Sequence, residues 1–242
     1  MEAWKGKVAL VTGASRGIGR AIARTLAEKG LSLALCARSK DKLEALKDEL
    51  RPFGVEVFIC PGDLADPSFP PSFVRETGEY FGRIDVVINN AGIALSKPLE
   101  VTTLEEWELQ MAVNVRAPFL ICREALPYLR RSPLATIINI SSVVGTKGYV
   151  HQGAYTASKH ALMGFTKVLA RELHKEGIRV HVIAPGGVET DLIAVMRPDL
   201  LQERLIAPSE IAEIVWFLLS LREGNAVIDE VHVRRASNEP WK

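Results

Sequence analysis

Residues 12–19 of the chain read Thr-Gly-Ala-Ser-Arg-Gly-Ile-Gly. A short apolar run at 8–11 precedes this stretch, and a helical pattern follows it over 17–29. Glycines let the backbone turn tightly and approach an anion closely, and the start of the helix offers that anion unpaired N–H groups. A strand, a glycine turn and a helix in this order predict the pyrophosphate-binding turn of a dinucleotide site. The alternative is a purely structural tight turn.

The rest of the chain alternates between strand-like and helical segments. Further short apolar runs occupy 31–37, 55–60, 84–88, 136–140, 179–183 and 227–233. Helical patterns cover 40–50, 104–129, 155–175 and 211–221, and another helix is expected to start near Pro71. Strands that are apolar on both faces and alternate with helices predict a parallel sheet covered on both sides. We therefore predict a single α/β domain over 1–242: a Rossmann-type, doubly wound parallel sheet of about seven strands with helices on both faces.

Composition excludes several classes of function. Thirty basic residues oppose 29 acidic ones, so charge gives no reason to expect nucleic acid or an anionic membrane as a partner. No apolar run is long enough to span a bilayer, and the N-terminus lacks the pattern of a signal peptide, so a cytoplasmic location is expected. The three cysteines and five histidines show no metal-ligand spacing. We expect the cysteines to be small, reduced core residues and no metal to be bound.

The end of the second strand predicts which dinucleotide binds. A carboxylate there would hold the 2′-hydroxyl of NAD, but this segment reads Cys36-Ala37-Arg38-Ser39, with no carboxylate before Asp41. Arg38, joined by Arg16 from the glycine turn, has the planar charged donors that suit a 2′-phosphate. NADP(H) is the predicted cofactor. The alternative is that Arg38 is a solvated loop residue.

Further motifs follow in a fixed order along the chain. They are Asp63-Leu64, Asn89-Asn90-Ala91-Gly92, Asn114, Ser142, Tyr155-x-x-x-Lys159, and Pro185-Gly186 followed by Thr190. With the glycine turn, this series resembles the short-chain dehydrogenase/reductase family from about residue 7 to residue 221. Within that family, the chain resembles members that act as 3-oxoacyl-(acyl-carrier-protein) reductases.

Tyr155 and Lys159 carry the expected chemistry. They lie four residues apart on a predicted helix and so share one face. A nearby ammonium favours the phenolate, so we expect Lys159 and the positive nicotinamide ring of the cofactor together to lower the pKa of Tyr155 toward neutrality for proton exchange with a carbonyl oxygen. Ser142 is expected to hold that oxygen, with Ser141 as its rival; the family spacing to Tyr155 favours Ser142. The resemblance implies that Asn114 holds a water of a proton relay, while a polar residue inside a helix is the alternative.

The resemblance also implies the cofactor contacts. Asp63 and Leu64 flank the adenine, Asn90, Ala91 and Gly92 lie against the ribose, and Val188 and Thr190 bind the carboxamide. The full expected cofactor set is Gly13, Ser15, Arg16, Gly17, Ile18, Gly19, Arg38, Asp63, Leu64, Asn90, Ala91, Gly92, Tyr155, Lys159, Pro185, Gly186, Val188 and Thr190. The catalytic set is Asn114, Ser142, Tyr155 and Lys159.

Three features depart from the family pattern. His181 stands where asparagine is usual and is expected to change local hydrogen bonding. Residues 191–207, which form the substrate lid in relatives, are shorter than in many of them, predicting an open or small pocket. The chain ends Val231-His232-Val233-Arg234-Arg235 without the usual glycine pair, which puts tetramer contacts through the tail in doubt.

The expected substrate is a small-molecule ketone or secondary alcohol. The predicted pocket walls are mostly apolar: Ile93, Ala94, Leu95, Val144, Tyr149, His151, Gln152 and Gly187. A 3-oxoacyl thioester is one candidate, and Arg130 with Arg131 would then face its acidic carrier. A broad carbonyl, steroid or sugar-alcohol dehydrogenase is the alternative, and a non-catalytic dinucleotide-binding sensor a more distant one. His160 is expected to pack. Small residues along 154–164 favour a homodimer or homotetramer.

Overall fold

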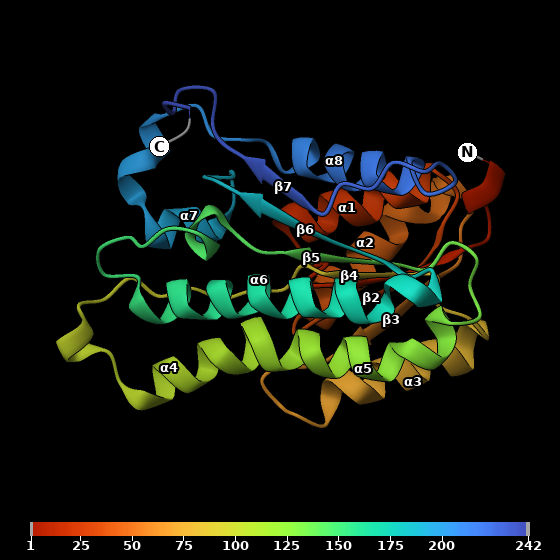
Figure 1. Cartoon of the computed structure of the whole chain (residues 1–242). Helices are drawn as coiled ribbons and strands as arrows, with labels where there is room; N and C mark the ends of the chain where they lie inside the picture. Colours follow the sequence, from red (N-terminus) through yellow and green to blue (C-terminus); the bar gives the residue numbers. More distant parts are fainter. Residues whose placement is uncertain (1, 241–242) are drawn as a thin grey trace.

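The computed structural model describes residues 2–240 as a parallel sheet between two layers of helices (Figure 1). The strand order is β3-β2-β1-β4-β5-β6-β7, and every neighbouring pair runs parallel. The strands are β1 Val8–Thr12, β2 Ser32–Ala37, β3 Val57–Pro61, β4 Val86–Asn89, β5 Thr136–Ile140, β6 Arg179–Pro185 and β7 Glu230–Val233. The predicted Rossmann-type fold is confirmed.

Each face of the sheet packs against its own set of helices. Alternate strand residues such as Val11 and Leu35 join one core cluster, under α1 Gly17–Glu28, α2 Lys40–Leu50 and α8 Pro208–Ser220. Their neighbours, Leu10 and Ala34, join the other, under α3 Phe69–Phe81, α5 Ala117–Leu129 and α6 Gly153–Leu173. Successive side chains of a strand point to opposite faces, so a strand buried on both must be apolar throughout.

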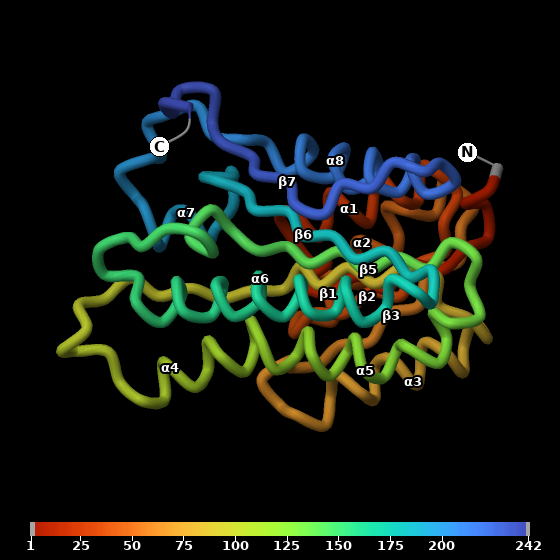
Figure 2. Tube along the Cα trace, viewed as in Figure 1, coloured from red at the N-terminus to blue at the C-terminus, as the bar shows by residue number. Residues whose placement is uncertain are grey.

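The predicted helix over 104–129 is interrupted. The structure has α4 Leu104–Met111, a π-helical turn at Ala112–Arg116 and then α5, although the three form one continuous rod (Figure 2). The interruption is invisible to apolar periodicity because the π turn inserts a residue without breaking the rod. Such turns recur at functional sites, and Asn114 lies in this one.

Strand order determines where a ligand can bind. After β3 the chain crosses to the other side of β1 and adds β4, so helices leave in opposite directions above β1 and β4. The gap between them opens at the carboxyl ends of the strands. The motifs at the ends of β1, β2, β4, β5 and β6 therefore meet at one edge.

Two further predictions can be checked against the fold. Cys36, Cys60 and Cys122 are buried and free, as expected. Within residues 2–240, no helix combines the length and apolarity that crossing a bilayer requires.

Candidate active site

A cavity of about 820 Å³ lies along the carboxyl ends of the strands. Every predicted site residue except Gly19 and Asn114 contributes to its wall. These residues are Gly13, Ser15, Arg16, Gly17, Ile18, Arg38, Asp63, Leu64, Asn90, Ala91, Gly92, Ser142, Tyr155, Lys159, Pro185, Gly186, Val188 and Thr190. This volume covers the glycine turn and the end of β2 as well as the segment 191–207, so it leaves the prediction of an open or small substrate pocket untested.

The glycine turn packs directly on the loop that follows β4. Gly13 and Gly17 have φ angles of +65° and +54°, which disfavour other residues. A Cβ on Gly19 would lie 2.3 Å from the carbonyl oxygen of Gly13. Gly19 therefore lies beneath the turn and outside the cavity wall, because the backbone must pass close to itself there. The turn is tied down by Thr12, whose Oγ1 accepts hydrogen bonds from the backbone N–H of Asn90 at 3.0 Å.

The N-terminus of α1 faces this cavity without a side-chain cap. Arg16 is the N-cap residue, yet its side chain makes no capping hydrogen bond. The first N–H groups of a helix carry partial positive charge and attract anions. The guanidinium of Arg16 instead pairs with the carboxylate of Asp191 at the start of α7 Asp191–Met196. The sequence did not predict this pair, because only the fold brings residue 191 across the turn.

Arg38 lies at the rim of the cavity where β2 ends. It is exposed, and among residues 2–240 its side chain has no ion-pair or hydrogen-bond partner. Lys42 and Ser39 line the same part of the wall, a contribution that the motif comparison missed. Ser39 caps α2, with its Oγ accepting from the N–H of Lys42 at 3.4 Å. Because this cap starts α2 directly after β2, Lys42 lies in the first turn of the helix, next to the cavity.

Tyr155 and Lys159 face the cavity from the first turns of α6. Both are buried, with 6% and 3% of their surfaces exposed. The Nζ of Lys159 donates to the carbonyl oxygen of Ile140 at 2.9 Å, at the end of β5. It lies 5.8 Å from the centroid of the Tyr155 ring.

Within the chain itself, burial decides the pKa values of Tyr155 and Lys159. Burial raises the pKa of Tyr155 to about 12, although a hydrogen bond with Ser142 works in the other direction. Burial also lowers the pKa of Lys159 to about 8. Loss of water disfavours the charged form of each group. The phenol is therefore protonated at neutral pH.

The structure separates the two candidate serines. Ser142 hydrogen-bonds with Tyr155 and also reaches the carbonyl oxygen of Pro185 at 3.4 Å. The hydroxyl of Ser141 points into the helix layer and donates to the carbonyl oxygen of Lys159 at 3.3 Å. Both serines line the cavity, but the hydrogen bond to Tyr155 belongs to Ser142.

Asn114 lies fully buried beside the cavity. Its amide group donates to the carbonyl oxygen of Ile93 and to Oγ of Ser158, and accepts from the N–H of Ile93, each at 2.9 Å. A Cβ placed on Gly92 would lie 3.4 Å from both Asn114 Oδ1 and Lys159 Nζ. Gly92 therefore leaves open the space between these two polar groups.

The substrate half of the cavity differs in part from the predicted walls. Ile93, Val144, Tyr149, Gln152 and Gly187 line it. Ala94, Leu95 and His151 do not. Ala94 instead packs in a buried cluster with Val144, Tyr155 and Met196. Sequence reasoning missed Leu109, Val113, Leu192, Ile193, Met196, Arg197, Leu200, Arg235 and Asn238, which belong to segments without a motif.

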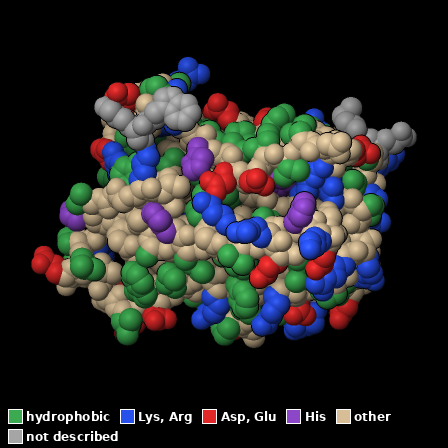
Figure 3. Space-filling view, in the orientation of Figure 1, with side chains coloured by type: hydrophobic (Ala, Val, Ile, Leu, Met, Phe, Trp, Pro, Cys, Tyr) green, Lys and Arg blue, Asp and Glu red, His purple; other side chains and the backbone are tan. Residues whose placement is uncertain are grey.

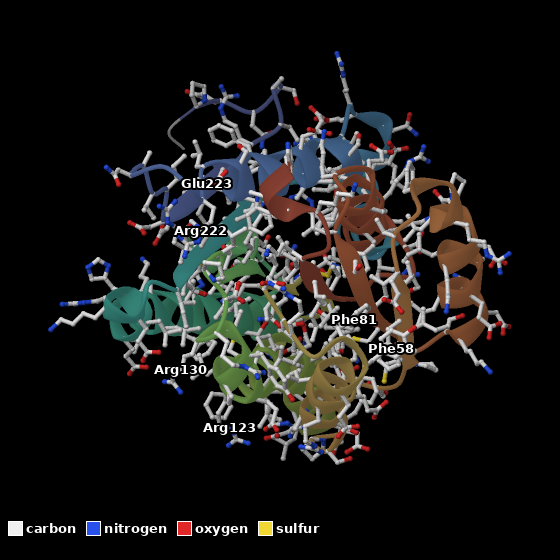
Figure 4. The ribbon with its side chains drawn as sticks, turned by 90° about the vertical axis from the view of Figure 1, so that its right-hand side faces the viewer. Phe58, Phe81, Arg123, Arg130, Arg222 and Glu223 are labelled. Atoms are coloured by element: carbon white, nitrogen blue, oxygen red, sulfur yellow. The ribbon has the colours of Figure 1, made fainter. Side chains whose placement is uncertain are left out.

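The basic pair at the end of α5 is remote from the cavity. Figure 4 looks onto the amino-terminal edge of the sheet, where Arg130 lies. Arg130 pairs with Glu176 at 2.7 Å, and Arg131 stacks over the ring of Tyr128. A helix that follows a strand returns to the opposite edge, so these arginines do not face the cavity. The packing expected of His160 is also wrong, because this side chain is exposed.

His181 bonds to the segment before β7. Its Nδ1 donates to the carbonyl oxygen of Ile228 at 2.7 Å, while Nε2 is buried with no partner in the described part of the chain. Burial lowers the pKa of His181, and the charge of Arg179 adds to this effect. The ring is therefore neutral and lies away from the cavity.

Comparison with known proteins agrees with this geometry. Residues 7–200 match the family described as short chain dehydrogenase. A 3-oxoacyl-[acyl-carrier-protein] reductase of Staphylococcus aureus is 37% identical over 236 residues, covering 94% of this chain and 96% of the relative. An alcohol dehydrogenase of the archaeon Thermococcus sibiricus, solved with 5-hydroxy-NADP, superimposes with a TM-score of 0.89 at 33% identity, covering 98% of this chain and 99% of its own. A blue fluorescent protein from a metagenomic library, solved with NADPH, gives 0.88 at 36% identity, with 96% and 97% covered.

Proposed function

The chain belongs to the short-chain dehydrogenase family of oxidoreductases, and from this premise we propose that it is an NADP(H)-dependent enzyme that interconverts a ketone and a secondary alcohol. The observation that carries the proposal is one cavity lined by Ser142, Tyr155 and Lys159 together with the glycine turn and Arg38. Reduction of a ketone needs a hydride and a proton at the same place. The anion-binding turn would hold the dinucleotide that carries the hydride, and the proton-transfer groups would supply the proton.

The residues present fit a dinucleotide. The uncapped start of α1 offers N–H groups to a pyrophosphate, and Gly13 and Gly17 leave room for it beside the loop after β4. Asp63 and Leu64 would flank the adenine, Asn90, Ala91 and Gly92 the ribose, and Pro185, Gly186, Val188 and Thr190 the nicotinamide end. When bound, the cofactor supplies or accepts the hydride.

Arg38 supports NADP(H) over NAD(H). Its guanidinium is exposed at the cavity rim and has no ion-pair partner among the described residues. Lys42 and Ser39 add donors on the same rim, so a 2′-phosphate would meet several of them. Arg16 pairs with Asp191 on the exposed surface, and such a weak pair leaves its guanidinium able to turn toward the same phosphate. Two similar structures were solved with NADP-type ligands, which supports the same choice.

Tyr155 is the proposed proton donor to the carbonyl oxygen during reduction. Its pKa of about 12 keeps the hydroxyl protonated at neutral pH, which reduction requires. As the carbonyl carbon gains a hydride, the oxygen takes the phenolic proton and becomes the alcohol. Ser142, hydrogen-bonded to the same hydroxyl, would orient that oxygen.

Lys159 is the proposed route by which Tyr155 regains its proton. A pKa of about 8 lets the ammonium release and recover a proton near neutral pH. Asn114 would hold a water in the space beside Gly92 and so link Lys159 to solvent. Its three hydrogen bonds to Ile93 and Ser158 fix the amide in place for this role.

The substrate class proposed is a ketone or secondary alcohol of largely apolar character. A 3-oxoacyl thioester is one member, supported by the similarity to the acyl-carrier-protein reductase. A broader carbonyl, steroid or sugar-alcohol activity is the alternative, which the apolar walls and the distant Arg130 favour.

Residues 1–242 are proposed to form one domain that assembles as a homodimer or homotetramer. Hydrophobic side chains gather on the outer face of α4, α5 and α6, along the lower half of Figure 3. Phe119 and Val168 are 43% and 56% exposed there. An exposed apolar face on adjacent helices is typical of a subunit interface.

The deciding experiment is NADPH oxidation by the purified protein with a panel of ketones that includes an acetoacetyl thioester. Turnover of at least one ketone is expected, and tight NADPH binding without any turnover would instead indicate a dinucleotide sensor.

Arg38→Asp tests the choice of cofactor. The substitution should weaken the affinity for NADPH by roughly a hundredfold and leave the affinity for NADH nearly unchanged. Arg51→Asp, at an exposed arginine outside the cavity, is the matched control. Equal losses for both cofactors would refute the phosphate role.

A further inference from the structure

Two departures from the family pattern meet in the structure. One is the short segment 191–207, and the other is the chain end after β7, where Arg234 and Arg235 replace the usual glycines. Arg235 is only 8% exposed and lines the cavity from its substrate half. The tail therefore contributes a side chain to the site itself.

The side chain of Arg235 is held at both ends. Its guanidinium pairs with Glu203, from the short segment, and donates to Oδ1 of Asn238 at 2.8 Å. Its stem packs on the loop after β6, where a Cβ on Gly187 would lie 3.4 Å from Arg235 Cδ and 3.6 Å from Leu200 Cδ1. A long side chain fixed in this way acts as a wall, because its stem covers apolar surface while its charge is satisfied elsewhere.

The charges on this side of the cavity are matched. Glu203 faces Arg235, and Arg197, the other arginine on the same part of the wall, pairs with Asp199 at 2.6 Å. Leu200, which lies between the two ion pairs along the chain, and Met196, which directly precedes Arg197, also line the cavity. Neither arginine is left to neutralise an anionic substrate, so this wall suits an uncharged, apolar group.

We infer that Arg235 is a specificity-determining residue, and that it limits the size of the apolar group that a carbonyl substrate carries toward the lid. This inference rests on the proposed function, since it assumes carbonyl reduction at Tyr155. The pair with Glu203 holds the wall in place by joining the tail to the lid. Shortening Arg235 removes the wall without touching Ser142, Tyr155 or Lys159.

The test compares ethyl acetoacetate with ethyl benzoylacetate, in which a phenyl group replaces the methyl group on the ketone carbon; the intrinsic difference in reactivity between the two ketones cancels when variants are compared with the wild-type protein. Arg235→Ala should raise the ratio of kcat/KM for the bulky ketone over the small one by roughly tenfold or more, mainly through a lower KM for the bulky one. Arg235→Lys, which keeps most of the stem, should change the ratio by less than about threefold. Glu203→Gln should shift it in the same direction as Arg235→Ala, and the double variant should add little, because both act on one wall. Arg204→Ala, on the exposed neighbour outside the cavity, should leave the ratio unchanged.

Three outcomes separate the possibilities. If the wild-type protein reduces neither these nor any other ketone, the proposed function fails. If it does reduce them and the ratio stays constant in Arg235→Ala, the wall is refuted. If Arg235→Ala selectively lost activity toward acetoacetate, the free acid, the wall would also be refuted, because Arg235 would then be a binding group for anionic substrates. NADPH binding, measured by fluorescence titration, shows whether each variant is folded. If Arg235→Ala does not bind NADPH, Arg235→Met is measured instead, and its kcat/KM ratio for the bulky ketone over the small one should rise by roughly threefold.

Discussion

The two edges of the sheet treat buried ionisable groups in opposite ways. At the amino-terminal edge, Asp85 is fully buried, and burial alone would raise its pKa. Arg83, Ser132 and the N–H of Val8 all donate to this carboxylate, at 2.5–2.9 Å, and together they lower the pKa below its usual value. Asp85 is therefore charged and links the starts of three neighbouring segments.

At the carboxyl-terminal edge, the same degree of burial leaves the charged forms disfavoured. Lys159 has one protein acceptor, the carbonyl oxygen of Ile140, and Tyr155 has Ser142. Without charged partners, desolvation decides both pKa values. The comparison teaches that partners supplied by the chain make a buried group structural, whereas groups with few partners remain available for chemistry. Four predictions test it.

Replacing Tyr155 by Phe should have the largest effect. Loss of the hydroxyl should lower kcat by about a thousandfold, or about 4 kcal/mol of transition-state stabilisation, because Tyr155 is the proposed proton donor and Ser142 is proposed only to orient the substrate oxygen. Steady-state NADPH oxidation measures it. Tyr128→Phe, at the other edge, should be neutral. A Tyr155→Phe enzyme within tenfold of wild type would remove the hydroxyl from the mechanism.

Asp85→Asn should cost stability and spare activity. An amide cannot accept all the bonds that the carboxylate accepts, so the free energy of unfolding should fall by about 3 kcal/mol in urea titration at pH 7. The pKa of Asp85 is lowered in the fold, so its contribution is present above the unfolded pKa and disappears as pH falls through the folded one. Asp48→Asn, at an exposed ion pair, is the control. An unchanged unfolding midpoint in Asp85→Asn would contradict the structural role.

Lys159→Met should do the reverse, stabilising the fold while abolishing turnover. Folding lowers the pKa of Lys159 from 10.5 to about 8, so the unfolded chain binds the proton more tightly. The cost of burying this charge is fully present below pH 8 and fades as pH rises toward 10.5. The variant should therefore gain about 2 kcal/mol at pH 7 and nothing at high pH. Equal or lower stability at pH 7 would show that Lys159 is a structural group like Asp85.

The smallest effect is the pH dependence of the wild-type enzyme. If protonated Lys159 returns the proton to Tyr155, kcat/KM for ketone reduction should fall by roughly tenfold between pH 7 and pH 9 as the ammonium titrates. Rates measured from pH 6 to pH 10 with saturating NADPH give the profile. A flat profile up to pH 10 would place the titrating group elsewhere.

Motifs on single segments predicted much of the site. The positions of Tyr155 and Ser142 in the cavity and the glycine turn against Asn90 agree with the pattern, because each depends on a strand end or a helix face that local periodicity reveals. The π-helical turn around Asn114 was not predicted, because it does not disturb the apolar periodicity of the helix. The lid and tail were not predicted as walls because they carry no motif.

By itself, the sequence determined the order of strands and helices, the two-sided apolar strands and the turn that only glycine permits, since these follow from local sterics and from burying apolar surface. The tertiary structure alone decided which charges are neutralised and which are desolvated. Arg16 met Asp191, Arg130 met Glu176, and Arg235 met Glu203, each across a long stretch of chain. Electrostatic effects depend on distance and on the loss of water, and a linear sequence specifies neither until the chain has folded.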